Sequence, residues 1–194
     1  MKIIFLDIDG VLNCEDAYKN GFCRKNDEYG QDFYPPSSNL LNQLIEETGA
    51  KVVVSSTWRH SGEKIMKEMW NHRKMAGEVI GVTPSMSFST MQFIIDGKEV
   101  DFYPCRGDEI KTWLNMNGFS QCFWSEEFQQ ESIEKSGIEN FIIIDDDSDF
   151  LYNQRQHFVH VKPSPRNKRG FHEGHYKQAK EILETPLMKL YGFV

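Results

Sequence analysis

Apolar residues follow two alternating patterns along the chain, short continuous runs and longer stretches with helical spacing. The continuous runs are rich in Ile and Val and predict buried strands, at residues 2–6, 51–56, 141–149 and 157–161. The stretches with helical spacing predict helices at residues 37–50, 62–75, 106–118 and 175–183. Strands that alternate with helices favour an α/β fold, in which a parallel, Rossmann-like sheet carries helices on both faces in three layers.

Start and stop signals support two of these helices. Ser37 or Ser38 can cap the start of the first one, and Gly49 suits its end. Gly118 closes the helix that begins at Arg106. Glycine is common at this position because it adopts the left-handed backbone conformation without strain.

Two stretches interrupt the alternation. Residues 14–36 follow the first strand and are rich in Tyr, Phe, Asn and Gly. Residues 77–104 contain FIIDGKEVDF, which is typical of a β-hairpin with Asp96 and Gly97 at the turn. Neither stretch is long enough for an independent domain, so we expect residues 1–194 to form one domain with only small flap or cap insertions.

Composition is that of an ordinary soluble globular protein. The 194 residues are 39% hydrophobic and 26% charged, and the formal net charge of −7 argues against a uniformly basic nucleic-acid-binding surface. No apolar run approaches the length of a membrane span, and the N-terminus starts with a strand-like run rather than a signal peptide. The four cysteines show neither zinc-ligand nor disulfide spacing, so we expect free thiols and a cytoplasmic protein.

Positive charge is concentrated in one basic stretch. Residues 154–180 contain seven Lys or Arg against a single acid, Glu173. This stretch is either a solvated surface balanced by acids elsewhere or a basic rim beside an anionic substrate. Its four histidines lack metal-ligand spacing, and we expect them to be structural or surface residues.

Chemically capable residues follow three of the predicted strands. Asp7 and Asp9 come after the first strand, residues 55–59 after the second, and residues 145–149 after the third. In open α/β sheets ligands bind beyond the carboxyl ends of the strands. If the three strands are neighbours, these groups converge on one site.

The first strand runs directly into Asp7, Ile8, Asp9 and Gly10. Two residues apart on an extended chain, the two acids share one face. Carboxylates held close together repel each other, which a fold tolerates best where a cation or a reaction uses the pair. An Asp-x-Asp pair alone also occurs in ordinary loops, but its place after a buried strand makes it a stronger signal.

The second strand ends in the sequence SSTWR. Its hydroxyls suit a phosphate or oxyanion, and the alternative is an ordinary helix cap. Arg59 either contacts a substrate anion or forms a surface ion pair. Trp58 either packs in the core or flanks the entrance to the site, and core packing is the more common fate.

The third strand ends in IIIDDDSD, with four acids among five residues. Such a cluster favours a hard divalent cation with oxygen ligands, and Mg²⁺ is the usual one beside phosphates. The alternative is a helix cap followed by a solvated acidic loop.

The order of these motifs resembles the four-motif pattern of the haloacid dehalogenase (HAD) superfamily, most of whose members are Mg²⁺-dependent phosphohydrolases. DIDGVLN and IIIDDDSD carry the resemblance, which extends over about residues 1–161. The segments SSTWR and RGDEIKTWL are most similar to the subgroup found in multidomain Swiss Army Knife RNA repair proteins.

The resemblance implies a catalytic role for each motif. Asp7 is the nucleophile that forms an aspartyl-phosphate, and Asp9 is the acid and base. Ser55 binds a phosphoryl oxygen, with Ser56 as the second choice. The catalytic cation is Arg106, with Lys111 as the reserve.

The resemblance also implies a Mg²⁺ site. Its expected ligands are the Asp7 carboxylate, the backbone carbonyl of Asp9 and the acids of residues 145–149. Among these acids Asp146 is favoured as a direct ligand, with Asp145 and Asp149 as partners in the same site.

The function expected from these residues is a Mg²⁺-dependent phosphatase whose substrates are phosphorylated nucleic-acid ends or nucleotides. A phosphatase of small phosphomonoesters such as sugar phosphates is one alternative. A non-catalytic binding module is another, and the presence of both Asp7 and Asp9 argues against it. Halide-removing members of the superfamily lack the second aspartate, so Asp9 argues against that activity as well.

Overall fold

The computed structural model describes residues 1–19, 21, 26–86, 91–122, 125–162 and 170–193. Five parallel strands form the central sheet in the order β5-β4-β1-β8-β9. Their bounds are β1 (Lys2–Leu6), β4 (Lys51–Val54), β5 (Val79–Val82), β8 (Asn140–Asp145) and β9 (Phe158–His160). The predicted α/β fold with a parallel sheet is confirmed, and β1 lies between β4 and β8 as the convergence of the motifs requires.

The central strands are apolar without alternation because both of their faces are covered. Ile4 and Leu6 of β1 belong to one core cluster, and Ile3 and Phe5 belong to the other. All four side chains are fully buried.

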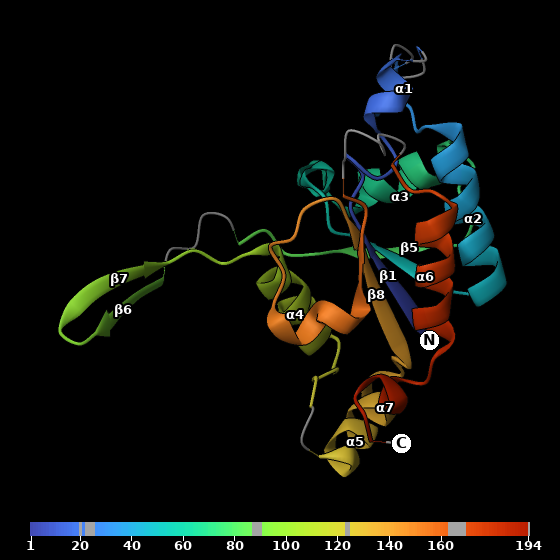
Figure 1. Ribbon diagram of the computed structural model, residues 1–194. Helices are drawn as coiled ribbons and strands as arrows, with labels where there is room; N and C mark the ends of the chain where they lie inside the picture. Colours follow the sequence, from blue (N-terminus) through green and yellow to red (C-terminus); the bar gives the residue numbers. More distant parts are fainter. Residues whose placement is uncertain (20, 22–25, 87–90, 123–124, 163–169, 194) are drawn as a thin grey trace.

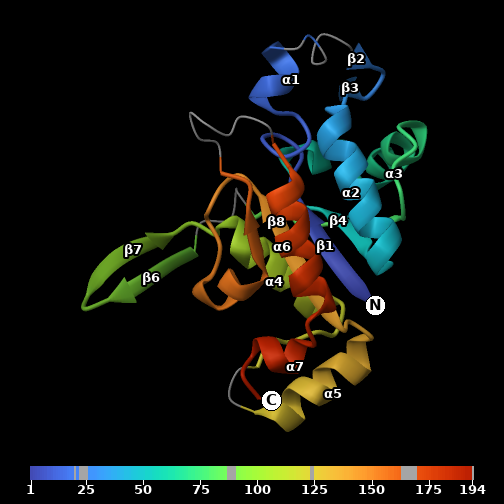
Figure 2. The ribbon, with the colours of Figure 1, turned by 45° about the vertical axis from the view of Figure 1, so that its right-hand side comes forward.

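Helices cover both faces of the sheet (Figure 1). The face of Ile4 and Leu6 is covered by α2 (Pro35–Thr48), α3 (Glu63–His72) and α6 (Glu173–Glu184). The opposite face is covered by α4 (Arg106–Met116) and, toward its edge, by α5 (Glu126–Ser136) and α7 (Leu187–Leu190). Both ribbon views place α5 and α7 at the end of the sheet where β1 begins (Figure 2). Within the described residues, no helix is both long and apolar enough to span a membrane.

Two of the three predicted helix ends are confirmed. Gly49 caps α2 with a φ of 66°, and Gly118 follows α4 with a φ of 79°. The predicted cap at Ser37 or Ser38 is wrong, because α2 begins earlier, at Pro35. Proline suits the first turn of a helix, where its missing N–H is not needed.

The two irregular stretches contain regular structure. Residues 14–36 hold α1 (Glu15–Lys19) and a small hairpin, β2 (Asn26–Asp27) and β3 (Gly30–Gln31). Residues 77–104 hold the predicted hairpin, β6 (Met91–Ile95) and β7 (Lys98–Phe102), which projects away from the sheet (Figure 1). Its turn is at Asp96 and Gly97, with φ values of 52° and 73°, as expected for a two-residue hairpin loop.

Besides α1, β2, β3 and the 3₁₀ helices η2 (Thr57–Ser61) and η3 (Tyr152–His157), three more elements were not anticipated from the sequence. Strand β5 lies inside the predicted insertion 77–104 but pairs with β4, so only the residues after it depart from the sheet. Helix α5 buries only Gln129 and Ser132 and has no apolar stripe to reveal it. Helix α7 is only four residues long, too short for a periodic pattern.

Candidate active site

The predicted motifs meet at the carboxyl-terminal edge of the sheet. The ladder continues past β1, since the backbone N–H of Asp7 donates to Ile144 (2.9 Å) and that of Ser55 donates to Leu6 (2.8 Å). The ends of β4, β1 and β8 are therefore held side by side. The sheet therefore fixes the backbone from which the Asp7 and Ser55 side chains project.

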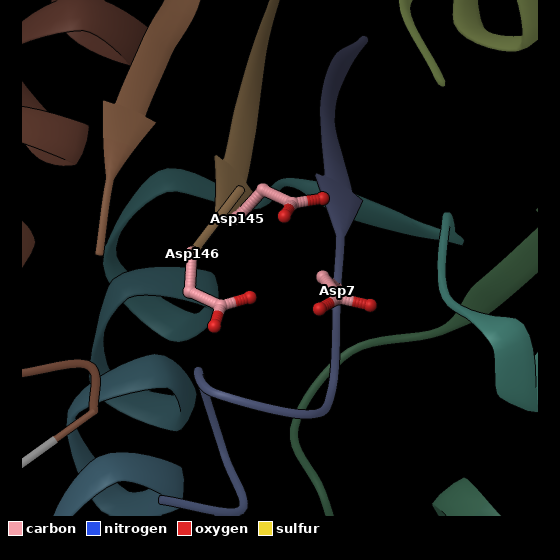
Figure 3. A group of neighbouring side chains, drawn as sticks. All are labelled: Asp7, Asp145 and Asp146. Atoms are coloured by element: carbon pink, nitrogen blue, oxygen red, sulfur yellow. The ribbon is translucent and has the colours of Figure 1, made fainter. Parts of the chain in front are cut away.

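Three carboxylates converge at this edge (Figure 3). Asp7, Asp145 and Asp146 each offer an oxygen atom, and these atoms all lie within 4.8 Å of one another. Asp7 is only 6% exposed and Asp145 only 1%. We call these three residues the acidic cluster.

Burial and mutual repulsion raise the pKa values of these carboxyls above those of carboxyls in water. Burial raises the pKa of Asp7 to about 6, although Arg106 and the Ser56 hydroxyl lower it. Burial, with the charge of Asp7 second, raises the pKa of Asp145 to about 8. Without a bound cation the cluster is thus a source of electrostatic strain.

Glycine at position 10 makes room for the acidic cluster. Gly10 has a φ of 77°, a conformation that disfavours other residues. A Cβ atom there would overlap the carboxylate of Asp146. The glycine of the DIDG sequence therefore turns the chain and also lets Asp146 approach Asp7.

Arg106 is the cation of the acidic cluster. Its Nη1 donates to Asp7 Oδ1 (3.2 Å) and to the Ser55 carbonyl, and its Nε lies 3.4 Å from Asp145 Oδ2. Burial lowers the pKa of Arg106, but the charges of Asp145 and Asp7 more than offset this effect. The net result is a raised pKa, so the side chain stays charged. The predicted reserve, Lys111, faces another hollow beside Leu114 and Asn115.

Close packing at the start of α4 positions Arg106. A Cβ atom at Gly107 would overlap the backbone of Leu151, so only glycine allows this approach. The Gly107 N–H donates to the Asp149 carbonyl (3.2 Å), and the Gly107 carbonyl accepts from Gln154 (2.9 Å). The Asp149 carboxylate accepts from the Arg106 N–H (3.2 Å). Asp149 thus caps α4 beside the acidic cluster and does not join it.

The structure distinguishes the two serines after β4. The Ser55 hydroxyl lies 3.5 Å from the Thr83 hydroxyl, on the neighbouring strand. The Ser56 hydroxyl lowers the pKa of Asp7 and accepts from the Trp58 N–H (3.5 Å). Which of the two hydroxyls binds a phosphoryl oxygen stays a prediction.

Asp9 lies apart from the acidic cluster. It is exposed, and Trp58 Nε1 donates to its Oδ2 (2.9 Å). Asn13 Nδ2 lies 3.4 Å from its Oδ1. The two acids of the motif therefore have different surroundings, one buried beside a cation and one open to solvent.

Arg59 does not face the site. Its side chain is buried, and its guanidinium donates to Glu109 (2.7 Å) and to the Ser56 carbonyl (2.9 Å). This buried ion pair differs from both expectations, a substrate contact and a surface pair. It ties the segment after β4 to α4.

The acidic cluster fits a hard divalent cation. Asp145 Oδ2 is buried and, apart from its ion pair with Arg106 Nε at 3.4 Å, has no hydrogen-bond partner within the described residues. Three carboxylates face one guanidinium, so the cluster carries excess negative charge when it is ionised. Oxygen ligands at this density are the donor set that Mg²⁺ prefers.

Two further contacts at the site were missed by sequence reasoning. Trp58 packs against the core, as the favoured prediction states, and its indole also bonds to Asp9. His160 Nε2 lies 3.1 Å from the Asp146 carbonyl, at the end of neighbouring strand β9. No local pattern signals either contact, because both join segments far apart in the sequence.

The basic stretch is described only in part. Lys180 pairs with Glu47, and Arg155 stacks over Tyr152 at 4.0 Å. Residues 163–169, which contain three of its seven cations, lie outside the described residues. The two interpretations of this stretch both remain predictions.

A parallel α/β sheet, with an Asp-x-Asp motif after its central strand and further acids after the next strand, defines a HAD-type domain. Comparison with protein-family models agrees: the model described as "HAD domain in Swiss Army Knife RNA repair proteins" matches residues 3–175. The chain therefore belongs to this family. A search of the curated proteins gave no match.

Proposed function

We propose that the protein is a Mg²⁺-dependent phosphohydrolase that acts through an aspartyl-phosphate on Asp7. The observation that carries the proposal is the placement of three carboxylates around one arginine at the sheet edge, with a separate exposed carboxylate two residues further on. The family to which the chain belongs supports a phosphohydrolase.

In the first step an oxygen of Asp7 forms a bond to phosphorus. The bond from phosphorus to the leaving oxygen breaks, its electron pair goes to that oxygen, and Asp9 donates a proton to it. In the second step a water oxygen attacks phosphorus, Asp9 accepts the proton, and Asp7 leaves as a carboxylate. Asp9 is suited to this exchange because it is exposed to solvent.

The neighbouring groups stabilise charge during both steps. Arg106 contacts Asp7 and places positive charge where the phosphoryl group would bind. The Ser56 hydroxyl favours the ionised form of Asp7, because it lowers the pKa of that carboxyl. The residues that would hold Mg²⁺ are Asp7, Asp145 and Asp146, with the backbone carbonyl of Asp9. When bound, Mg²⁺ supplies the positive charge that offsets the carboxylates and the phosphoryl oxygens.

For the substrate we favour phosphorylated nucleic-acid ends or nucleotides. The exposure of Asp9 is compatible with a bulky leaving group, and the family description refers to RNA repair proteins. The second candidate is a small phosphomonoester such as a sugar phosphate, which the same chemistry would serve.

The test is a phosphate-release screen with Mg²⁺. It compares 3′- and 5′-phosphorylated oligonucleotides with mononucleotides and sugar phosphates, and Asp7→Asn protein serves as the background. We expect release by the unmodified protein, fastest from an oligonucleotide. Release from none of these substrates would contradict the proposed reaction, and faster release from sugar phosphates would favour the second candidate.

A further inference from the structure

Trp58 contacts both Asp9 and Ser56. It lies on the 3₁₀ helix η2 (Thr57–Ser61), which begins directly after β4 and Ser56. Its backbone N–H donates to the Ser56 hydroxyl, the group that lowers the pKa of Asp7. Its indole N–H donates to Asp9 Oδ2 at 2.9 Å. Trp58 thus contacts Asp9 directly and contacts Ser56, which influences Asp7.

The indole ring of Trp58 packs against Phe33 and Arg73. The Phe33 ring lies 6.3 Å from the indole, and the Arg73 guanidinium lies over Phe33 at 4.3 Å and beside Trp58 at 5.5 Å. Arg73 is itself fixed by two hydrogen bonds to Asp27, at 2.8 and 2.9 Å. Gly30, with a φ of 109°, approaches the edge of the ring. The indole N–H therefore points at Asp9 from a rigid position.

Asp9 needs such support because little else restrains it. Its carboxylate is exposed, and its other described hydrogen bond, from Asn13, is long at 3.4 Å. A free aspartate side chain on a surface loop samples several rotamers. A proton donor that must meet one leaving oxygen loses efficiency when it is misplaced by even about 1 Å.

We infer that Trp58 is a positioning residue that holds the Asp9 carboxylate in place for proton transfer to the leaving group. The inference rests on the proposed phosphohydrolase reaction. Under this inference, residues 26–33 and Arg73 support the site indirectly, because Phe33 packs against the indole and Asp27 bonds to Arg73. In the first step, substrates whose leaving group needs no proton should depend little on Trp58.

The experiment compares Trp58→Phe with the unmodified protein on aryl and alkyl phosphates of graded leaving-group acidity. Phenylalanine keeps a ring against Phe33 and removes the N–H. We expect kcat/KM, which reports only on transfer of the phosphoryl group to Asp7, to fall about tenfold on phenyl phosphate and on alkyl phosphates, and less than about threefold on 2,4-dinitrophenyl phosphate, whose leaving group departs unprotonated. Hydrolysis of the aspartyl-phosphate, in which Asp9 acts as the base, is the same for all of these substrates and does not enter kcat/KM.

A double variant and a matched control separate positioning from general damage. In an Asp9→Asn background, Trp58→Phe should cause no further loss, because the group that it positions is already disabled. Trp70→Phe also removes a tryptophan N–H, one that bonds to the Ala76 carbonyl at 2.9 Å. It should lower stability without changing the dependence on the leaving group.

An NMR measurement reads the contact without turnover. The Trp58 indole proton, assigned by its loss in Trp58→Phe, should shift in Asp9→Ala while that of Trp70 stays in place. An unshifted Trp58 signal, equal losses across the leaving groups, or additive losses in the double variant would each overturn the inference and leave the proposed reaction intact. No turnover of any phosphate by the unmodified protein would contradict the reaction and the inference together.

Discussion

Replacement of Asp7 by Asn should make the metal-free protein more stable at neutral pH. Asp7 is almost fully buried, and burial raises its pKa to about 6. Because the folded state binds this proton more tightly than the unfolded chain does, stability falls as the pH rises from about 4 to 6 and stays lower above that range. Asn removes the titrating group with little change of shape.

The magnitude follows from the size of the shift. A rise from the usual value near 3.9 to about 6 corresponds to about 3 kcal/mol of unfolding free energy at pH 7.5. The attraction to Arg106 is already contained in that pKa. Asp7→Asn should therefore gain about 3 kcal/mol, or about 6–12 °C in Tm for a chain of this length. Near pH 4 the gain should vanish.

The assay is urea unfolding in excess chelator, followed by tryptophan fluorescence at several pH values from 4 to 7.5. Asp27→Asn is a control with the opposite sign. The hydrogen bond from Arg73 lowers the pKa of Asp27, so its loss should reduce stability at pH 7.5 and matter less in acid. If Asp7→Asn is no more stable than the unmodified protein at pH 7.5, the claim of a strained acidic cluster is wrong.

Four more predictions follow from the site and the core. Mg²⁺ at about 100 times its Kd should add about 2.7 kcal/mol to the unfolding free energy, measured in urea, and Asp145→Asn should lose most of this gain. Gly10→Ala should also abolish it, because a Cβ atom displaces Asp146; an unchanged Mg²⁺ titration would contradict that packing. Arg106→Ala should lower kcat at least a hundredfold, more than Lys111→Ala, in a phosphate-release assay. His157 has its pKa lowered to about 4 by burial, so its contribution to stability, present above about pH 6.5, is lost as the pH falls toward 4; in His157→Gln the urea midpoint should fall less over that range.

The position of the site was predictable because it depends on strands and their order. Three apolar runs end in polar residues, and a parallel sheet brings those ends to one edge. The condition that the three strands be neighbours is met, because β1 lies between β4 and β8. The family resemblance pointed to Arg106, with Lys111 in reserve, and the guanidinium of Arg106 forms an ion pair with Asp7.

Side-chain directions after the strands were not predictable in the same way. Ser55 and Ser56 are neighbours in the sequence, and which hydroxyl reaches Asp7 depends on how the chain turns into η2. Arg59 is buried because Glu109, on a distant helix, meets it there. The indole of Trp58 likewise depends on the packing of Phe33 behind it. Each of these contacts joins segments that no local pattern relates.

Secondary structure was missed where hydrophobic periodicity is weak. Strand β5 has only four residues and is interrupted by Gly81, which faces the indole of Trp113. Helix α5 carries charged and amide residues on most of its surface. Tertiary contacts stabilise both elements more than their own sequences do.

The central claim is that Asp7 forms the covalent intermediate, and rapid-quench mass spectrometry tests it most directly. The protein is mixed with Mg²⁺ and p-nitrophenyl phosphate, quenched in acid during turnover and digested, and the peptide containing residues 3–13 is weighed. We predict one added phosphoryl group on Asp7, none in Asp7→Asn, and turnover by that variant below about 1% of the unmodified protein. A phosphoryl group on another residue, or substantial turnover by Asp7→Asn, would contradict the account.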